Sequence, residues 1–300
     1  AAHAGISLSE AEASIASPFT SKKADVACVP TLVAEGRCAL VTSFGIFKYM
    51  VCYSLTQFLS VSLLYWIGTT LDDFQFLYID LFLTTNLMVF FGFTAPCPRL
   101  SARSPPTRLL CYQSFFSIGL QMGLVFVVQI FVYNLVPLQP WFVPFVDPGD
   151  EKNNASYQGT ALFIVSLYQY MSLMLVYSKS HPYRRTVLSN FLLTGSFLIC
   201  ILVSIWLSVD PPDVFQSLMS MQLSPLFKFR WFLVLLGIFD LLIALFLEDV
   251  FLDGFYDRSY RRDQKRKFDE QNLTSENYRT RPKYSQLSLS SGKHPSTFFQ

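Results

Sequence analysis

Polar side chains are rare in the long apolar stretches of this sequence, and a few of them are spaced as in a cation site. Tyr49, Tyr53 and Gln57 follow one another at intervals of four residues, which places them on one face of a helix. Asp73 and Asp80 are seven residues apart, so two carboxylates would share a helical face about 10 Å apart along its axis. Carboxylates supply charge and aromatic rings contact cations through their faces. The pattern therefore predicts a cation site between two helices.

The same residues also have a structural interpretation. Tyrosine and glutamine side chains join transmembrane helices through hydrogen bonds, and Asp80 could pair with a buried base elsewhere in the chain. From spacing alone, the cation site and the structural interpretation both stay open. For Asp240, in the last apolar stretch, no polar stripe surrounds the carboxylate, so a structural role is favoured.

Helices that cross a membrane must position these residues. Of the 300 residues, 52% are apolar and 15% charged, and the apolar residues gather in blocks. A helix needs about 20 mainly apolar residues to cross the hydrocarbon core. Six stretches have that length: residues 44 to 67, 74 to 93, 110 to 136, 160 to 177, 187 to 209 and 229 to 248. We therefore expect an all-α polytopic membrane protein with six transmembrane helices.

The placement of basic residues predicts which side each loop faces. Segments 94 to 109 and 178 to 186 and the tail after residue 252 are rich in Lys and Arg, whereas segment 68 to 73 has none. By the positive-inside bias, both ends of the chain are cytosolic. The opposite, luminal ends of the spans carry the tryptophans, Trp66, Trp141, Trp206 and Trp231. The luminal loops are also acidic, which would concentrate cations at that side.

Other chemistries find no support in the sequence. The six cysteines form no Cys-x-x-Cys pair, and the three histidines have no carboxylate or thiol at ligand spacing. No phosphate-binding glycine loop and no Ser/His/Asp constellation is present, and nothing indicates a nucleic-acid partner. One modification is predicted, because Asn154-Ala155-Ser156 is an N-glycosylation acceptor in a luminal loop.

Several strings of the chain together resemble one family. They are residues 1–19 (AAHAGISLSEAEASIASPF), 35–44 (EGRCALVTSF), 47–50 (FKYM), 53–58 (YSLTQF), 73–80 (DFQFLYID) and 139–142 (QPWF). These strings resemble the type V P-type ATPases of subgroup B, the polyamine pumps of endosomes and lysosomes. The resemblance is strong over residues 1 to 80 and continues as a span pattern to about residue 250.

The resemblance implies how the chain is divided. Residues 1–43 would be the end of the phosphorylation domain and a stalk, and residues 44–252 a six-helix transmembrane domain. Residues 253–300 would be a basic cytosolic tail without fixed structure. The six spans would correspond to the fifth through tenth spans of the pump.

The resemblance also implies a substrate and a route. Polyamines would move from the lumen of a late endosome or lysosome to the cytosol, along a path lined by Tyr53, Gln57 and Asp80. Asp73 would lie near the luminal mouth. Residues 30 to 45 would act as a stalk that carries the motion of cytosolic domains to this path.

ATP and Mg²⁺ are the cofactors that the family implies. The phosphorylated aspartate, the nucleotide pocket and the magnesium-binding motif of the family have no counterpart in these residues. We therefore expect the chain alone to bind neither cofactor and to hydrolyse no ATP. Its expected partners are the lipid bilayer, a polyamine or other cation, and the N-terminal part of the pump.

Two other classes of function stay open. A stand-alone secondary cation transporter or channel needs no more than six spans, but no inverted repeat or broken helix is evident. A membrane scaffold could bind anionic lipid through the basic tail, although that tail is more simply a positive-inside anchor.

Overall fold

The structure is a computed structural model, and it describes residues 5–8, 15, 17–22, 25–101, 104–105, 109, 111–146, 154–178 and 182–253. It divides into one unit of residues Ala1–Glu248 and a second of residues Asp249–Gln300. The expected cytosolic tail lies outside the described residues from position 254 onward.

Among the described residues, six helical stretches are long and apolar enough to cross a membrane, which confirms the predicted number. They are Cys28–Tyr65, Asp73–Phe91, Tyr112–Leu138, Tyr157–Tyr177, Phe191–Val209 and Phe227–Val250. The main helices are α1 (Cys28–Tyr65), α4 (Tyr112–Leu135), α5 (Tyr157–Tyr177), α6 (Phe191–Val209) and α8 (Phe227–Leu247). Shorter elements are α7 (Asp213–Leu218), the 3-10 helices η2 (Val136–Leu138) and η3 (Val187–Ser189), and the π-helix η4 (Glu248–Asp253).

Helix α1 begins sixteen residues before the predicted span, since it starts at Cys28 rather than at residue 44. Charged residues such as Glu35 and Arg37 kept this part out of the apolar window. Pro30 lies in the first turn, where a missing backbone N–H costs no helical hydrogen bond. The 38 residues of α1 therefore form one rod about 57 Å long. The expected stalk and the first span are one continuous helix.

The second span differs from the single helix predicted for residues 74 to 93. It consists of α2 (Asp73–Leu77), the π-helix η1 (Tyr78–Thr85) and α3 (Asn86–Phe91). Asp72 caps its start by accepting a hydrogen bond from the Phe74 backbone N–H. The Thr85 hydroxyl donates to the carbonyl of Asp80, five residues earlier, at 2.7 Å. Such wide turns within a helix occur frequently at functional sites.

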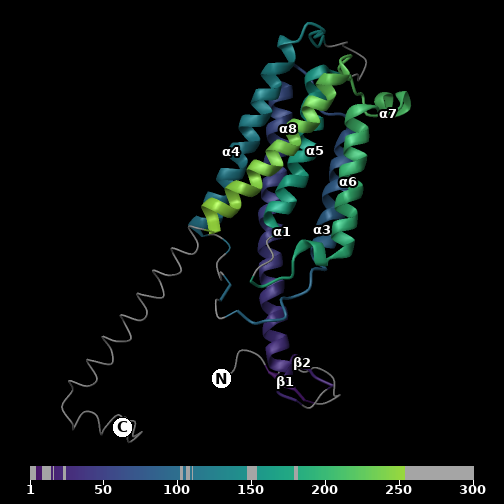
Figure 1. The fold of residues 1–300 in the computed structure, drawn as a ribbon. Helices are drawn as coiled ribbons and strands as arrows, with labels where there is room; N and C mark the ends of the chain where they lie inside the picture. The colour runs from purple at the N-terminus through teal and green to yellow at the C-terminus, as the bar shows by residue number, and fades with distance from the viewer. Residues whose placement is uncertain are drawn as a thin grey trace, which may run out of the picture. The chain divides into compact units, whose positions relative to one another are not determined.

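Helix α5 is the central helix of the first unit. In its apolar window 94% of the residues are buried, whereas the other five spans have 17 to 39%. It contacts α1, α4, α6, α8 and η1, and Figure 1 shows it among these helices. Gly237 lets α8 approach α5 closely, because a Cβ atom there would lie 2.5 Å from the ring of Tyr168. The core is therefore built around one fully enclosed helix.

At the N-terminal end of α1 lies a two-stranded parallel sheet (Figure 1). It pairs β1 (Ile6–Ser7) with β2 (Phe19–Thr20), and Ile6 lies opposite Phe19. These strands belong to the segment expected to be the end of a phosphorylation domain.

The opposite end of the bundle holds the tryptophans. Trp141 packs edge-on against Tyr157 and Phe229, with ring centroids 5.0 and 5.1 Å away. Trp206 packs in the same way against Phe215 of α7 at 5.3 Å. The assignment of this end to the lumen stays a prediction.

Glycosylation tests that assignment. Asn154 lies at the tryptophan end, where its carbonyl accepts a hydrogen bond from Thr69 at 3.0 Å, just before α5. In cells, the wild-type protein should show a glycosidase-sensitive shift in electrophoretic mobility that Asn154→Gln removes. The matched control is Asn272→Gln, in a second acceptor sequence predicted to be cytosolic, which should leave the shift unchanged. Sugar on Asn272 would reverse the predicted orientation.

Candidate functional site

Tyr53 and Asp80 form the centre of the candidate site. The Tyr53 hydroxyl on α1 donates a hydrogen bond to the Asp80 carboxylate on η1. Within the described part of the chain, no Lys or Arg forms an ion pair with Asp80. The predicted alternative of a buried base next to Asp80 is therefore absent from these residues. Asp80 is exposed on the surface of this chain although it lies mid-span.

Gln57 and Asp73 lie around this pair at different distances. Gln57 is half-buried, one turn along α1 from Tyr53, and its side chain interacts with the Tyr53 hydroxyl. Asp73 is exposed in the first turn of α2, and within the described part of the chain no hydrogen bond joins it to the pair. Because η1 is wider than an α-helix, the seven-residue spacing no longer fixes the angle between the Asp73 and Asp80 carboxylates.

Tyr170 is a component of the site that the sequence analysis missed. Its ring on α5 lies 5.6 Å from the ring of Tyr53, at an interplanar angle of 52°. It is completely buried. No polar stripe marks Tyr170 in the sequence, because almost every residue of α5 faces a neighbouring helix. Three elements that are distant in sequence therefore meet at the site.

Buried amides hold the helices around the site together. The Ser60 hydroxyl donates to Gln129 Oε1 at 3.1 Å, and Gln129 Nε2 donates to Gln169 Oε1 at 3.0 Å. This chain joins α1, α4 and α5 through side chains that are almost fully buried. Hydrogen bonds of this kind join helices in membranes, so the structural interpretation fits these three residues.

The start of the second span is fixed by the loop after α7. Gln75 Nε2 donates to the carbonyl of Met219 at 2.9 Å, and the Ser220 hydroxyl donates to Asp72 Oδ1 at 3.0 Å. Asp72 therefore has partners of its own, whereas the neighbouring Asp73 stays exposed.

Helix α1 packs closely against α3 and α5 at Gly45, about two turns from Tyr53 on the stalk side. A Cβ atom at Gly45 would lie 2.8 Å from the Tyr177 carbonyl oxygen and 2.9 Å from the Phe91 ring. On Phe91 lies the guanidinium of Arg184, 4.1 Å from the ring centroid, and Arg184 donates to the Phe91 carbonyl at 2.8 Å. Burial lowers the pKa of Arg184 below its ordinary value.

Two further carboxyl groups are buried in or near α8. The Glu248 carboxylate accepts hydrogen bonds from Ser117 at 3.1 Å and from Gln121 at 3.4 Å. Asp240 is also buried, but its Oδ1 has no hydrogen-bond partner among the described residues. The sequence favoured a structural role for Asp240, but no hydrogen bond at Oδ1 supports that role.

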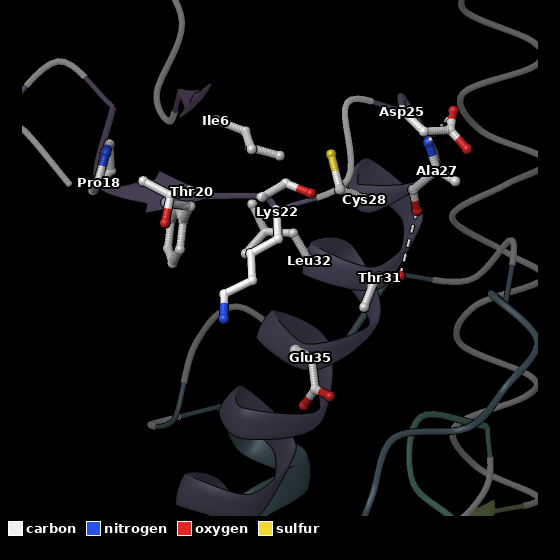
Figure 2. A pocket seen from close by; sticks show the side chains of 12 residues that line it. Ile6, Pro18, Thr20, Lys22, Asp25, Ala27, Cys28, Thr31, Leu32 and Glu35 are labelled. Carbon is white, nitrogen blue, oxygen red and sulfur yellow. Dashed lines mark hydrogen bonds between the residues drawn. The ribbon is translucent and has the colours of Figure 1, made fainter. Parts of the chain in front are cut away.

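An open hollow of about 650 Å³ lies between the strands and the start of α1. Figure 2 shows its lining, with Lys22, Asp25 and Glu35 among apolar side chains such as Leu32. Tyr53 lies 18 residues beyond Glu35 on the same helix, about 27 Å along its axis. The hollow is therefore separate from the Tyr53 and Asp80 pair.

Comparison with known proteins finds relatives among ATPases, although no protein-family model matches the chain. A probable cation-transporting ATPase, catp-6 of Caenorhabditis elegans, is 48% identical over 262 residues, covering 85% of this chain and 20% of the relative. Polyamine-transporting ATPase 13A2 of Mus musculus is 42% identical over 253 residues, covering 83% and 21%. Polyamine-transporting ATPase 13A3 of Homo sapiens is 31% identical over 270 residues, covering 83% and 22%. The chain spans about a fifth of the length of these curated relatives.

The close approach at Gly45 predicts a selective loss of stability. In the full-length protein, Gly45→Ala should lower the thermal unfolding midpoint, because overpacking costs about 1 to 3 kcal/mol. Gly36→Ala is the matched control on the same helix, since a Cβ there meets nothing within 4 Å. It should leave the midpoint unchanged or raise it, because Ala is favoured over Gly within helices. Equal midpoints for the two variants would show that α1 is not packed against Phe91 as described.

Proposed function

The chain belongs to the type V P-type ATPases of subgroup B, and on that premise we propose that it forms the substrate path of an ATP-driven polyamine pump. The observation that carries the proposal is the Tyr53 and Asp80 pair, a mid-span carboxylate that meets an aromatic hydroxyl and no base among the described residues. The similarity of the chain to transporting ATPases disfavours the two other functions, a stand-alone transporter and a lipid-binding scaffold.

The cost of an intramembrane charge supports a cation as the partner of Asp80. A carboxylate at the bilayer centre costs roughly 2.5 to 3.5 kcal/mol on insertion scales, so it needs a compensating partner or role. A hydrogen bond from Tyr53 meets only part of this need, because it supplies no positive charge. A bound cation would neutralise the carboxylate.

The kind of cation follows from the groups around Asp80. A small metal ion takes several oxygen ligands within about 2.6 Å, but no hydrogen bond among the described residues joins Asp73 to this pair, and it offers no second carboxylate there. The rings of Tyr53 and Tyr170 instead provide aromatic faces, which suit organic ammonium groups. An extended polyamine could contact Asp80 and Asp73 with different nitrogens, as a compact ion could not.

The transport direction is proposed from the mouth at Asp73 past Asp80 toward the stalk, that is from the lumen of a late endosome or lysosome to the cytosol. ATP and Mg²⁺ would act in parts of the pump outside this chain. The continuous helix α1 supports mechanical coupling, because a rigid rod that starts at Cys28 also carries Tyr53 and Gln57. Movement of its cytosolic end would therefore reach the site directly.

Substitution of the two carboxylates tests the proposal. In the purified full-length pump, Asp80→Asn should abolish polyamine-stimulated ATPase activity, because it removes the counter-charge inside the membrane. Asp73→Asn should mainly raise the half-saturating polyamine concentration, most for longer polyamines and at low ionic strength, since a mouth charge is screened by salt. Gln57→Ala and Tyr53→Ala should have intermediate effects. The measurement is the ATPase rate against spermine, spermidine and divalent metals.

The matched control is Asp213→Asn. Asp213 is likewise exposed in the first turn of a short helix, α7, at the same end of the bundle. Its loss should change the half-saturating concentration less than Asp73→Asn does. Full spermine stimulation in Asp80→Asn, or loss of metal stimulation alone in both carboxylate variants, would contradict the polyamine site.

A further inference from the structure

Three buried hydroxyl groups close to Asp80 have no hydrogen-bond partner among the described residues. They belong to Tyr49 on α1, Thr84 on η1 and Tyr170 on α5. All three side chains are at least 97% buried. Hydroxyl groups that are buried without a hydrogen-bond partner are uncommon, because each one lowers the stability of the folded state. Three such groups on three neighbouring elements indicate a shared missing partner.

The three hydroxyls belong to one cluster. The Tyr49 hydroxyl interacts with Thr84, although not with the geometry of a hydrogen bond. The Tyr170 hydroxyl interacts with Ser166 on its own helix, again without the geometry of a hydrogen bond, and it is within electrostatic range of Tyr49, Tyr53 and Asp80. The cluster therefore adjoins the candidate site, with Tyr170 in contact with both.

The cluster forms a second layer, one step deeper than the Tyr53 and Asp80 pair. Tyr49 precedes Tyr53 by four residues on α1, and Thr84 follows Asp80 by four residues on η1. Because the two helices run in opposite directions, both steps lead toward the stalk. On α1 the step is about 6 Å, one helical turn. Three or four methylene groups between two amine nitrogens span a comparable distance.

The chemistry of the cluster selects its occupant. A hydroxyl oxygen has two lone pairs, so all three groups can accept hydrogen bonds at once. An alkylammonium group has three N–H donors, which matches three acceptors. A water molecule has two donors and no charge, so it would leave the nearby Asp80 carboxylate without a cation. The cluster is thus better matched to an ammonium group than to a water.

We propose that the hydroxyls of Tyr49, Thr84 and Tyr170 form a deeper subsite for the leading ammonium group of an extended polyamine. The next ammonium group along the molecule would pair with Asp80 one layer behind. This inference rests on the proposed function and adds the residues that receive the end of the substrate. On α1 the subsite lies one helical turn from Gly45, where the helix packs closely against the Tyr177 carbonyl and the Phe91 ring.

Terminally blocked substrates test the subsite. Spermine acetylated at both terminal nitrogens lacks both end charges but keeps the inner ones, so it should lose the contact with the hydroxyls. Wild-type full-length pump should prefer spermine over this analogue, measured as half-saturating concentrations for ATPase stimulation. In Tyr170→Phe, Tyr49→Phe and Thr84→Val the preference should fall about tenfold, as expected for the loss of a hydrogen bond to a charged group.

Two control variants separate this effect from a loss of folding. Thr84→Ser keeps the hydroxyl and should keep the preference. Tyr168→Phe removes another buried hydroxyl of α5, which lies outside the proposed subsite and has Ser208 on α6 as its partner at 3.2 Å. It should lower the thermal unfolding midpoint without changing the preference. Thermal unfolding of every variant is measured in parallel.

The outcomes for the subsite and for the pump are distinguishable. If the three hydroxyl variants keep the wild-type preference while Asp80→Asn abolishes stimulation, the subsite is wrong and the proposed function stands. A shifted unfolding midpoint with an unchanged preference would show that the hydroxyls contribute only to stability, and it would also overturn the subsite. If Asp80→Asn keeps full stimulation, the proposed function itself fails.

Discussion

A carboxylate inside a membrane needs a partner, and the arrangement of this bundle around Asp80 follows from that constraint. Lipid tails offer no hydrogen bonds and no counter-charge, so the protein or its substrate must supply both. Tyr53 supplies one hydrogen bond, and the described residues supply no base. The remaining need for positive charge is the physical basis of the proposed cation binding.

The central position of α5 makes the site possible. Because this helix is enclosed by its neighbours, it can place Tyr170 against Tyr53 while Gln169 joins the buried amide chain with Gln129. One face of α5 therefore serves the candidate site and another holds the bundle together. The close approach of α8 at Gly237 adds to this enclosure. Rigid support of this kind keeps functional side chains in position.

The long helix α1 connects the expected stalk with the candidate site. Its stalk part lines a hollow together with the strands β1 and β2, and its span part carries Tyr49, Tyr53 and Gln57. The second span is different, since its π-helix η1 presents Asp80 and Thr84 in a widened turn. A rigid rod next to a locally irregular helix is suited to convert displacement of the rod into a change at the site.

The sequence by itself determined the six spans, since crossing a membrane is a local matter of length and apolarity. It also determined the family, through strings such as residues 53–58 and 73–80, and it singled out Tyr53 and Asp80 by their polarity in apolar surroundings. Only the tertiary structure showed the π-helix, the central position of α5, and the contact of Tyr170 with Tyr53. The reason is that lipid-facing and protein-facing positions of a span are both apolar, so hydrophobic pattern alone does not tell which helix is enclosed. Which hydroxyls meet without partners depends on how three helices pack, and no single segment contains that information.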